Sequence, residues 1–539
     1  MAKNRQQPQG SAAQPVPSVS HTGSTANGTG DQDRSKHGRM PSPEDIPFQW
    51  RLSLALAAVF FLIELLTNQT TIKILALVLI PVTIVCCVIR LSVLETRVTI
   101  PMLAVTAWVV MNGVSMFYGL SSKLALREFL RIVVGFCGFL LILAWSRRGT
   151  GQGRTVASVL EGATALASLI SIDMISTRLL SGLLFQFLSL FSQDYSYVME
   201  NPLEAGIRIN SLYENPNVFA SIAGLAVILG LETSLTSGEK RERRFHLICL
   251  YLNALACLLV FSMGASAFLA LAFLVLLLVE RKERKGALLL LMIETFGAVI
   301  VAVIPIYLTS FRSWSGIQPV PLLCAVAGAV LLCGLDHVVG HPLGAKLGDK
   351  AKLVYVAIVV VLGVMAAYVF LAINLTGPAK LAAGENLRRA AYPVPGRYAL
   401  DIDATAPVTV SIESQNRAET MMHTETTLYQ GKAQGATFTV PGDSEVVYFR
   451  FSSSEDLTLE SATYTGDSGH GRLPLNYLLL PGFIANRLQG LFANENAIQR
   501  TVFFDDGLKL FAESPLIGQG LGAFDAACRH VQSFDYGTK

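Results

Sequence analysis

The chain has 539 residues, of which 52% are hydrophobic and only 15% are charged. A soluble protein of this size carries about a quarter charged residues, so the composition excludes an ordinary soluble globular protein. The formal net charge of +3 is too small to indicate a nucleic-acid partner. The apolar residues gather in runs that approach the roughly 20 residues needed to cross a bilayer. The sequence therefore predicts a multi-pass protein whose first partner is the lipid bilayer.

Residues 1–47 are rich in Gln, Ser, Gly, Pro and Thr and contain almost no large apolar residues. Such a segment buries too little apolar surface to fold, so we expect a disordered cytoplasmic tail.

Residues 48–373 are predicted to form a transmembrane helical bundle. If the N-terminus is cytoplasmic, the loops on that side carry sixteen Lys and Arg residues against seven on the other side. This asymmetry is the positive-inside bias, and it predicts that everything after residue 373 is extracytoplasmic. The eleven apolar runs lie at about 52–66, 72–89, 99–118, 126–145, 155–172, 216–234, 246–262, 264–279, 286–308, 319–338 and 351–373.

The eight cysteines indicate neither a disulfide framework nor a metal site. Seven lie in apolar runs, Cys528 lies near the end of the chain, and no CxxC spacing occurs. We therefore expect no metal and no cofactor.

Residues 374–475 differ from the apolar runs in composition and residue pattern. Segments such as TVSIES, ATFTVP and EVVYFRFS combine β-forming residues with Gly, Pro and Asp turns between them. The pattern predicts an extracytoplasmic all-β sandwich of jelly-roll type, inserted after the bundle. Two interpretations stay open for it: a structural addition, or a module that binds glycan or a partner outside the cell.

Residues 476–539 are predicted to form an outer-face amphipathic segment. A helix is expected from Asn494 or Asn496 to about Glu513. At 100° per residue, its apolar face holds Phe503, Phe504, Leu508, Leu510 and Phe511, and its polar face holds Asp505, Asp506, Lys509 and Glu513. Ile498 and Val502 do not fit this apolar stripe.

Arg500 falls in the middle of the predicted apolar face. Desolvating an arginine there is costly unless an anion accompanies it, so the position indicates anion binding. The alternative is that Arg500 bends back to a carboxylate or to lipid headgroups.

The glycines of PLIGQGLG, at 518, 520 and 522, lack the strand–helix context of a nucleotide loop. They predict a sharp turn that brings the backbone close to another element.

The stretch RINSLYENPNVFA, residues 208–220, places an arginine ahead of an Asn-Pro-Asn turn that opens a long apolar helix. Asn215 is expected to cap this helix and Pro216 fits its first turn. The positive helix start and Arg208 together predict a phosphate site. The alternative is an ordinary loop with Arg208 snorkelling to the membrane surface.

At these residues the chain resembles the O-antigen ligase and polymerase superfamily of membrane glycosyltransferases. The resemblance rests on RINSLYENPNVFA, on Arg500 followed by SPLIGQGLGAF, and more weakly on LLVFSMGASAFLALAF, where Met263 stands at a position that is often arginine in the family. It covers the helical framework from about residue 50 to 373 and not the β-domain.

The resemblance implies a metal-independent enzyme on the outer face of a bacterial cytoplasmic membrane. It would transfer a sugar or oligosaccharide from undecaprenyl diphosphate to a hydroxyl of a glycan, lipid or protein, as a polymerase or a ligase. By this resemblance Arg208 and Arg500 hold the diphosphate, and Asn215 and Asn217 shape the turn. Arg127 and Arg131 are candidates for additional phosphate contacts in place of the charge missing at Met263; the alternative is that they snorkel to lipid headgroups.

The family places a catalytic histidine after the Gly-x-Gly turn, and His530 stands in that window without the Asn that usually follows it. Further membrane helices follow in the family. The resemblance therefore implies that the chain as given is truncated after Lys539 and inactive.

Two other classes of function stay open. A transporter or flippase of lipid-linked sugars would use intramembrane carboxylates, for which Glu64, Glu294 and Asp336 are available. A non-catalytic, membrane-anchored glycan-binding scaffold would use the β-domain as its working part.

Overall fold

The computed structural model of the chain describes residues 80–81, 83, 99–146, 150–189, 203–204, 208–209, 215–311, 317–347, 350–480, 485 and 495–534. The predicted tail 1–47 and the predicted run 52–66 lie outside these residues. So do most of the run 72–89 and most of the segment 481–494.

Each of the nine apolar runs predicted from 99–118 onward coincides with a helix. Two short helices, α6 and α13, were not predicted, because their 11 and 7 residues are too few to stand out as membrane-crossing runs. The helices are α3 (Ile100–Ser115), α4 (Ser122–Ser146), α5 (Thr150–Met174), α6 (Leu179–Ser189), α8 (Pro216–Thr236), α9 (Lys240–Leu259), α10 (Met263–Val279), α11 (Lys282–Ile306), α12 (Val320–Leu335), α13 (His341–Leu347) and α14 (Ala351–Asn374).

Among the described residues, five helical segments are long and apolar enough to cross a membrane. They are Arg154–Met174, Pro216–Thr236, Lys282–Ser310, Val320–Gly344 and Tyr355–Asn374. The last of these shows its apolar side chains at the surface, with Val359 and Phe370 each 69% exposed. Such exposure suits a helix in contact with lipid. These features are compatible with a membrane protein, while the full set of eleven spans and their orientation remain predictions.

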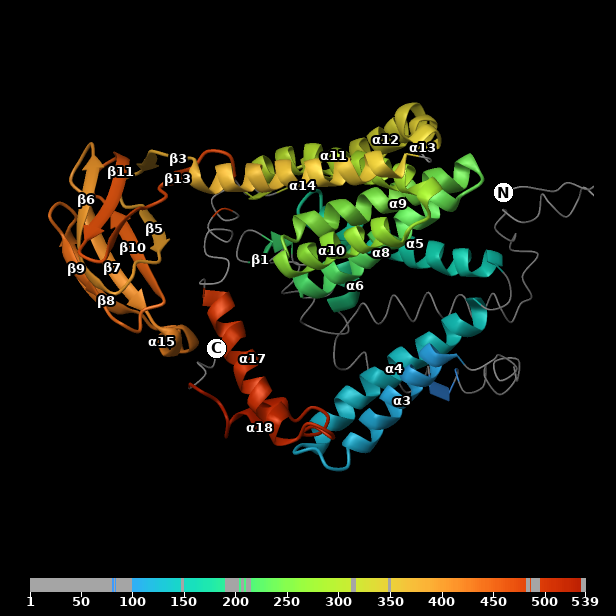
Figure 1. Cartoon of the computed structure of the whole chain (residues 1–539). Coiled ribbons are helices and arrows are strands. Elements are labelled where there is room, and N and C mark those ends of the chain that lie inside the picture. The colour runs from blue at the N-terminus through green and yellow to red at the C-terminus, as the bar shows by residue number, and fades with distance from the viewer. Residues whose placement is uncertain are drawn as a thin grey trace, which may run out of the picture.

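Helices α8 and α9 pack as a close antiparallel hairpin inside the bundle, where α5, α11 and α12 also contact α9 (Figure 1). Gly230 permits the close approach, because a Cβ at that position would lie 3.1 Å from Leu250 Cβ. Phe219, Leu231 and Tyr251 are fully buried in the resulting core. The hairpin fixes where α8 begins, and with it the turn that precedes α8.

Ion pairs join the predicted cytoplasmic loops at one end of the bundle. Arg154 contacts Glu242 at 3.8 Å, Arg243 contacts Asp336 at 2.6 Å, and Arg284 contacts Glu232 at 3.0 Å. α14 starts at this end and runs 24 residues, or roughly 36 Å, toward the β-domain. The start of α8 and the start of α10 therefore lie at the opposite end of the bundle, on the side of the β-domain (Figure 1).

The β-domain is an antiparallel sandwich of two sheets. One sheet has the order β5-β10-β7-β8; the other has the order β12-β11-β6-β9, and β4 also pairs with β11. Phe438, Phe449, Phe451 and Leu459 are buried between them. The strands are β3 (Thr376–Gly377), β4 (Ala379–Leu381), β5 (Asn386–Ala391), β6 (Gly396–Ala404), β7 (Thr409–Gln415), β8 (Thr426–Lys432), β9 (Thr437–Val440), β10 (Val446–Ser452), β11 (Leu457–Gly466), β12 (Gly469–Arg472) and β13 (Asn476–Tyr477).

Eight of the nine strands in the two sheets, in the orders β4-β11-β6-β9 and β5-β10-β7-β8, have the arrangement of a jelly roll. The ninth strand, β12, pairs with β11 beside β4. β3 pairs with β13, so the chain enters and leaves the domain at one place beside the end of α14. The domain is thus inserted through a single pair of neighbouring connections.

After the β-domain, α17 (Glu495–Glu513) and the short α18 (Phe524–Cys528) form the last described part of the chain. The predicted helix of this segment is confirmed, but the prediction of its faces was wrong. Its buried residues are Ile498, Val502, Asp506 and Leu510, one helical turn apart. Phe504 and Phe511 are 70% and 61% exposed.

The physical reason is that the Asp506 carboxylate is paired with Lys509 and hydrogen-bonded by Ser533, which is 27 residues away in the chain. This fully buried carboxylate accepts hydrogen bonds from Lys509 Nζ (2.8 Å), Ser533 N (3.0 Å) and Ser533 Oγ (2.6 Å). Once its charge is paired and hydrogen-bonded, Asp506 can be buried. The face that carries Arg500 is consequently left open.

The turn predicted for PLIGQGLG is confirmed. Gly518, Gly520 and Gly522 all have φ between 68° and 92°. A Cβ at Gly520 would lie 2.5 Å from Gly119 Cα, between α3 and α4, so only glycine permits this backbone contact. Tyr118 Oη also donates to Ile517 O at 2.5 Å.

Candidate functional site: an arginine-lined cavity

The Asn-Pro-Asn turn forms the start of α8 as the sequence predicts. Asn215 has an extended conformation, and its side chain accepts hydrogen bonds from the backbone N–H groups of Asn217 (2.9 Å) and Val218 (3.4 Å). Pro216 occupies the first turn, where its missing N–H leaves no bond unmade. Asn215 is therefore the helix cap.

Arg208, on the short strand β2 (Arg208–Ile209), is held by the start of α8 and the end of α9. Its Nη2 donates to Asn217 Oδ1 at 2.8 Å, and its Nε donates to Val260 O at 3.2 Å. Ser262, which caps α10, donates to the same Asn217 oxygen at 2.9 Å. Asn217 thus orients the arginine, a more direct role than shaping the turn.

A cavity of about 1070 Å³ opens beside these residues, and we call it the arginine cavity. Both Arg208 and Arg500 line it. The bundle contributes Arg208, Asn217, Ala220, Ser221, Gly224, Leu225, Ile228, Phe261, Ser262, Met263, Gly264, Ala265, Phe268, Leu269 and Ala272. The later part of the chain contributes Arg388, Ala390, Tyr392, Tyr448, Glu495, Asn496, Ala497, Arg500, Thr501 and Phe504.

Arg500 reaches the cavity from the open face of α17. It forms no hydrogen bond or ion pair with the residues that the structure describes, so the predicted alternative of a carboxylate partner is not seen among them. Its position is set by neighbouring contacts, since Gln499 Nε2 donates to Thr420 O at 3.2 Å and Glu495 Oε1 lies 2.8 Å from His423 Nδ1. Those contacts join α17 to α15 (Arg417–Met422) of the β-domain, as Figure 1 shows.

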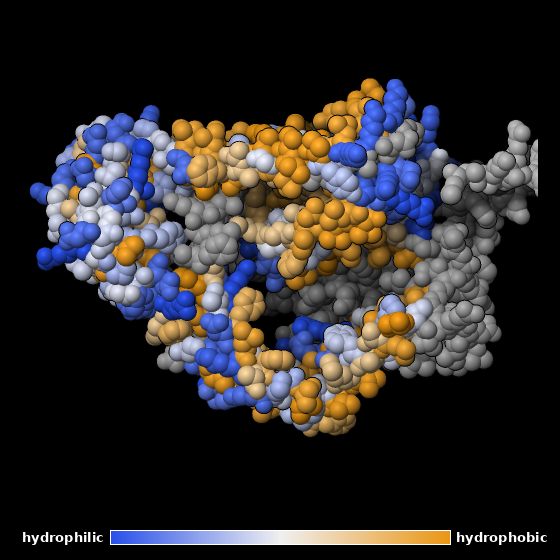
Figure 2. Space-filling view, viewed as in Figure 1, coloured by the Kyte–Doolittle hydropathy of each residue, from blue (hydrophilic) through white to orange (hydrophobic). Residues whose placement is uncertain are grey.

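The cavity has a charged part and an apolar part. Among the residues that the structure describes, three guanidinium groups line it against one carboxylate, that of Glu495. Because a guanidinium binds phosphate or carboxylate with two parallel hydrogen bonds, the charged part suits an anionic group. The apolar part follows α8 and α10, through residues such as Leu225, Ile228 and Phe268. In Figure 2 the surface is hollowed between these helices and α17, and hydrophobic residues cover much of the face of the bundle that is in view.

Met263 lies at the first turn of α10 and lines the cavity. It is 36% exposed, so the position is open to the cavity although it carries no charge.

The other phosphate-binding positions inferred from the resemblance lie elsewhere. On α4, Arg127 and Arg131 both contact Glu128 at 3.1 Å, and neither lines the arginine cavity.

The structure also does not bring His530 to the cavity. Its Nε2 lies 3.0 Å from Glu513 Oε2, at the far end of α17. Thirteen residues of helix separate Glu513 from Arg500, which corresponds to roughly 20 Å along the axis. In this arrangement His530 is too far from Arg500 to accept a proton from a group bound there.

Two polar features of the structure are not indicated by the sequence. One is the β-domain wall of the cavity, with Arg388 and Tyr448. The alternation of polar and apolar residues in NLRRAAY indicates which side chains share a face, but nothing in it shows what that face meets.

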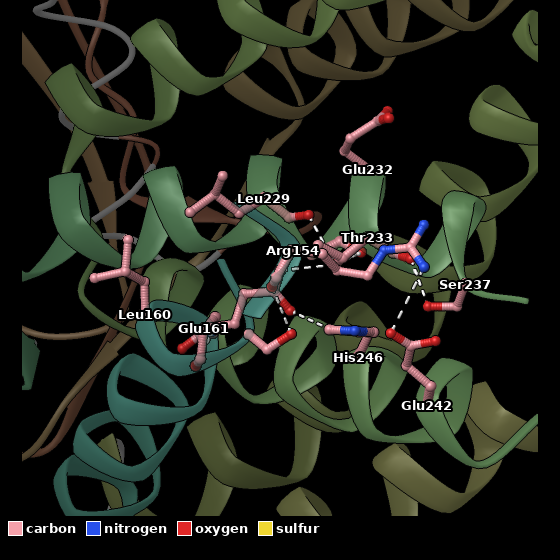
Figure 3. Close-up of polar contacts among 12 residues, drawn as sticks. Arg154, Leu160, Glu161, Leu229, Glu232, Thr233, Ser237, Glu242 and His246 are labelled. Carbon is pink, nitrogen blue, oxygen red and sulfur yellow. Dashed lines mark hydrogen bonds and ion pairs between the residues drawn. The ribbon is translucent and has the colours of Figure 1, made fainter. Parts of the chain in front are cut away.

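The second is a polar cluster inside the bundle (Figure 3). Glu161 and His246 are completely buried, with Glu161 Oε2 2.7 Å from His246 Nδ1, and Thr233 Oγ1 donates to Glu161 Oε1 at 2.7 Å. These three residues come from α5, α8 and α9, so only the packed bundle brings them together.

Of the carboxylates considered for transport, Glu64 lies outside the described residues. Asp336 is held by Arg243, whose Nε and Nη2 donate to its two oxygens. Glu294 is buried on α11, and its carboxylate oxygens have no hydrogen-bond partner among the described residues.

Comparisons of the chain with protein-family models, with curated proteins and with solved structures find no match.

Proposed function

We propose that the protein transfers a sugar or oligosaccharide from a polyprenyl diphosphate, such as undecaprenyl diphosphate, to an acceptor hydroxyl at the outer face of a bacterial cytoplasmic membrane. It would act as a polymerase or a ligase of surface glycan. The observation that carries the proposal is that Arg208 and Arg500, from distant parts of the chain, line the same cavity.

The chemistry of the leaving group explains why two arginines suit this reaction. When the acceptor hydroxyl attacks the anomeric carbon, the C–O bond to the diphosphate breaks and the diphosphate takes the electron pair. Negative charge therefore grows on the diphosphate in the transition state. Guanidinium groups held in advance stabilise that charge without reorganising. Asn217 and Val260 hold Arg208 in this manner.

The shape of the cavity supports a lipid-linked donor. A polyprenyl chain is apolar, and α8 and α10 contribute apolar side chains such as Leu225, Ile228 and Phe268 to the walls of the cavity. The diphosphate would lie at the polar end while the lipid tail follows the helices into the bilayer.

The position of the cavity supports the outer face. It lies at the end of the bundle opposite the basic loops, which the positive-inside bias assigns to the cytoplasm.

The test uses the full chain in lipid nanodiscs. We expect it to bind undecaprenyl diphosphate at least tenfold more tightly than undecaprenyl monophosphate, because two arginines need two phosphates to act together. We expect this binding to be unchanged when EDTA is present, because the groups that would hold the diphosphate are guanidinium groups. Equal affinity for the two lipids would contradict the proposal, and so would binding that Arg208→Ala leaves unchanged.

A second candidate function is transport of lipid-linked sugars. The observation in its favour is the buried Glu161–His246 pair, since ionisable residues within a membrane bundle often serve proton-coupled transport. Under this alternative, Glu161→Gln would abolish uptake by sealed vesicles while leaving the protein folded.

A further inference from the structure

The β-domain forms one wall of the arginine cavity. Arg388 and Ala390 on β5, Tyr392 just after it, and Tyr448 on β10 all line the cavity. In the register of the sheet, Arg450 lies opposite Arg388 and Tyr448 lies opposite Ala390. These side chains therefore occupy the outer face of one sheet, and part of that face is turned toward Arg208 and Arg500.

The wall has a defined geometry. The guanidinium carbon of Arg388 lies 3.7 Å from the centre of the Tyr448 ring, and Arg388 forms an ion pair with Glu425. Stacking on the ring sets the plane of the guanidinium. The neighbouring Arg389 points the other way and donates to Pro474 O (2.7 Å) and Leu475 O (3.0 Å) inside the domain. One arginine thus supports the fold and the next faces the cavity.

The β-domain is also fixed relative to Arg500. The contacts of His423 with Glu495 and of Thr420 with Gln499 lie within about one and a half turns of Arg500 along α17. A group bound by Arg500 therefore has the face with Arg388 beside it.

We propose that this face of the β-domain is a saccharide subsite, in which Arg388, Tyr392 and Tyr448 bind the hydroxyl or carboxylate oxygens of a sugar next to the diphosphate. The inference rests on the proposed function, because that function places a sugar adjacent to the phosphates. The saccharide belongs either to the donor or to the acceptor. The chemistry of recognition is the same for both, since planar forks of N–H donors and phenol hydroxyls bind sugar oxygens from either source.

The variants for the test are Arg388→Ala and Tyr392→Phe, in the full chain in nanodiscs. Arg450→Ala is the matched control, because Arg450 lies opposite Arg388 and also contacts Glu425, at 3.4 Å, without lining the cavity. The probes are bare undecaprenyl diphosphate, undecaprenyl-diphosphate-linked sugars, and a panel of soluble oligosaccharides that includes neutral, N-acetylated and uronate-bearing members.

We expect Arg388→Ala to weaken saccharide binding about tenfold and to leave the affinity for bare undecaprenyl diphosphate unchanged, with Arg450→Ala like the wild type. Loss confined to the lipid-linked sugar assigns the subsite to the donor. Loss confined to the soluble oligosaccharides assigns it to the acceptor. A wild type that retains no saccharide of the panel overturns the inference.

An equal loss for bare lipid diphosphate also overturns it, since Arg388 would then be a third phosphate ligand, while the proposed function stands. Conversely, the protein could bind saccharide through Arg388 and not bind lipid diphosphate. That result would refute the proposed function and leave the subsite in place.

Discussion

Replacing Arg500 by alanine should weaken the binding of a lipid diphosphate and leave the fold intact. Arg500 lies on the open face of α17 and lines the arginine cavity, whereas the helix is held by its buried residues Ile498, Val502, Asp506 and Leu510. A hydrogen bond to a charged group contributes about 1.5–3 kcal/mol. At 1.4 kcal/mol for each factor of ten, the affinity should fall roughly 10- to 150-fold.

The assay is titration of undecaprenyl diphosphate into nanodiscs that contain the variant, with thermal unfolding measured alongside. Arg500→Lys keeps the charge and loses the planar fork, so it should lie between alanine and the wild type. Arg529→Ala is the matched control, because Arg529 is exposed after α18 and does not line the cavity. If Arg500→Ala and Arg529→Ala bind as tightly as the wild type, Arg500 is not a phosphate ligand and the reasoning fails.

Three further predictions concern the fold and the alternatives. Gly520→Ala should release the glycine turn from the connection between α3 and α4, because φ of Gly520 is +92° and the new Cβ would lie 2.5 Å from Gly119 Cα. Faster hydrogen exchange in residues 514–523 would show this release. Gly507→Ala is the control and should not cause it, because the nearest atom to its new Cβ lies 3.7 Å away. Burial raises the pKa of Glu425 in the β-domain, so its contribution to stability is present below the ordinary pKa of glutamate and is lost as the pH rises through the raised value. Thermal unfolding across pH 4–8 should show that loss in the wild type, and its persistence in Glu425→Gln would contradict the assignment. Glu161→Gln should lower the unfolding temperature through a weakened buried pair, at a cost of about 1–3 kcal/mol, yet leave the affinity for undecaprenyl diphosphate unchanged. A folded variant that has lost uptake by sealed vesicles would favour transport.

Periodic features of the chain were the ones that sequence could predict. Apolar runs follow directly from composition, so the helices between α3 and α14 were expected at close to their observed places, except the short helices α6 and α13. The Asn215 cap was also predictable, since its partners are two and three residues away. The close backbone contact at the glycine turn followed from residue type, although its partner between α3 and α4 did not.

The features that were not predicted depend on distant partners. A helical wheel placed Asp506 on the solvent side, because the wheel contains no information about Ser533, which satisfies its carboxylate. The same limit explains why Arg388 was not singled out. Its role depends on how the β-domain docks on α17, through His423 and Glu495, which are 72 residues apart in the chain.

The central claim is that Arg208 and Arg500 act on one ligand, and a double-mutant cycle tests it most directly. The affinity for undecaprenyl diphosphate is measured in nanodiscs for the wild type, Arg208→Ala, Arg500→Ala and the double variant. Residues that share a ligand couple by about 0.5–3 kcal/mol, whereas independent sites add within about 0.5 kcal/mol. We predict a coupling above 1 kcal/mol; single losses that simply add, or either loss being absent, would contradict the account.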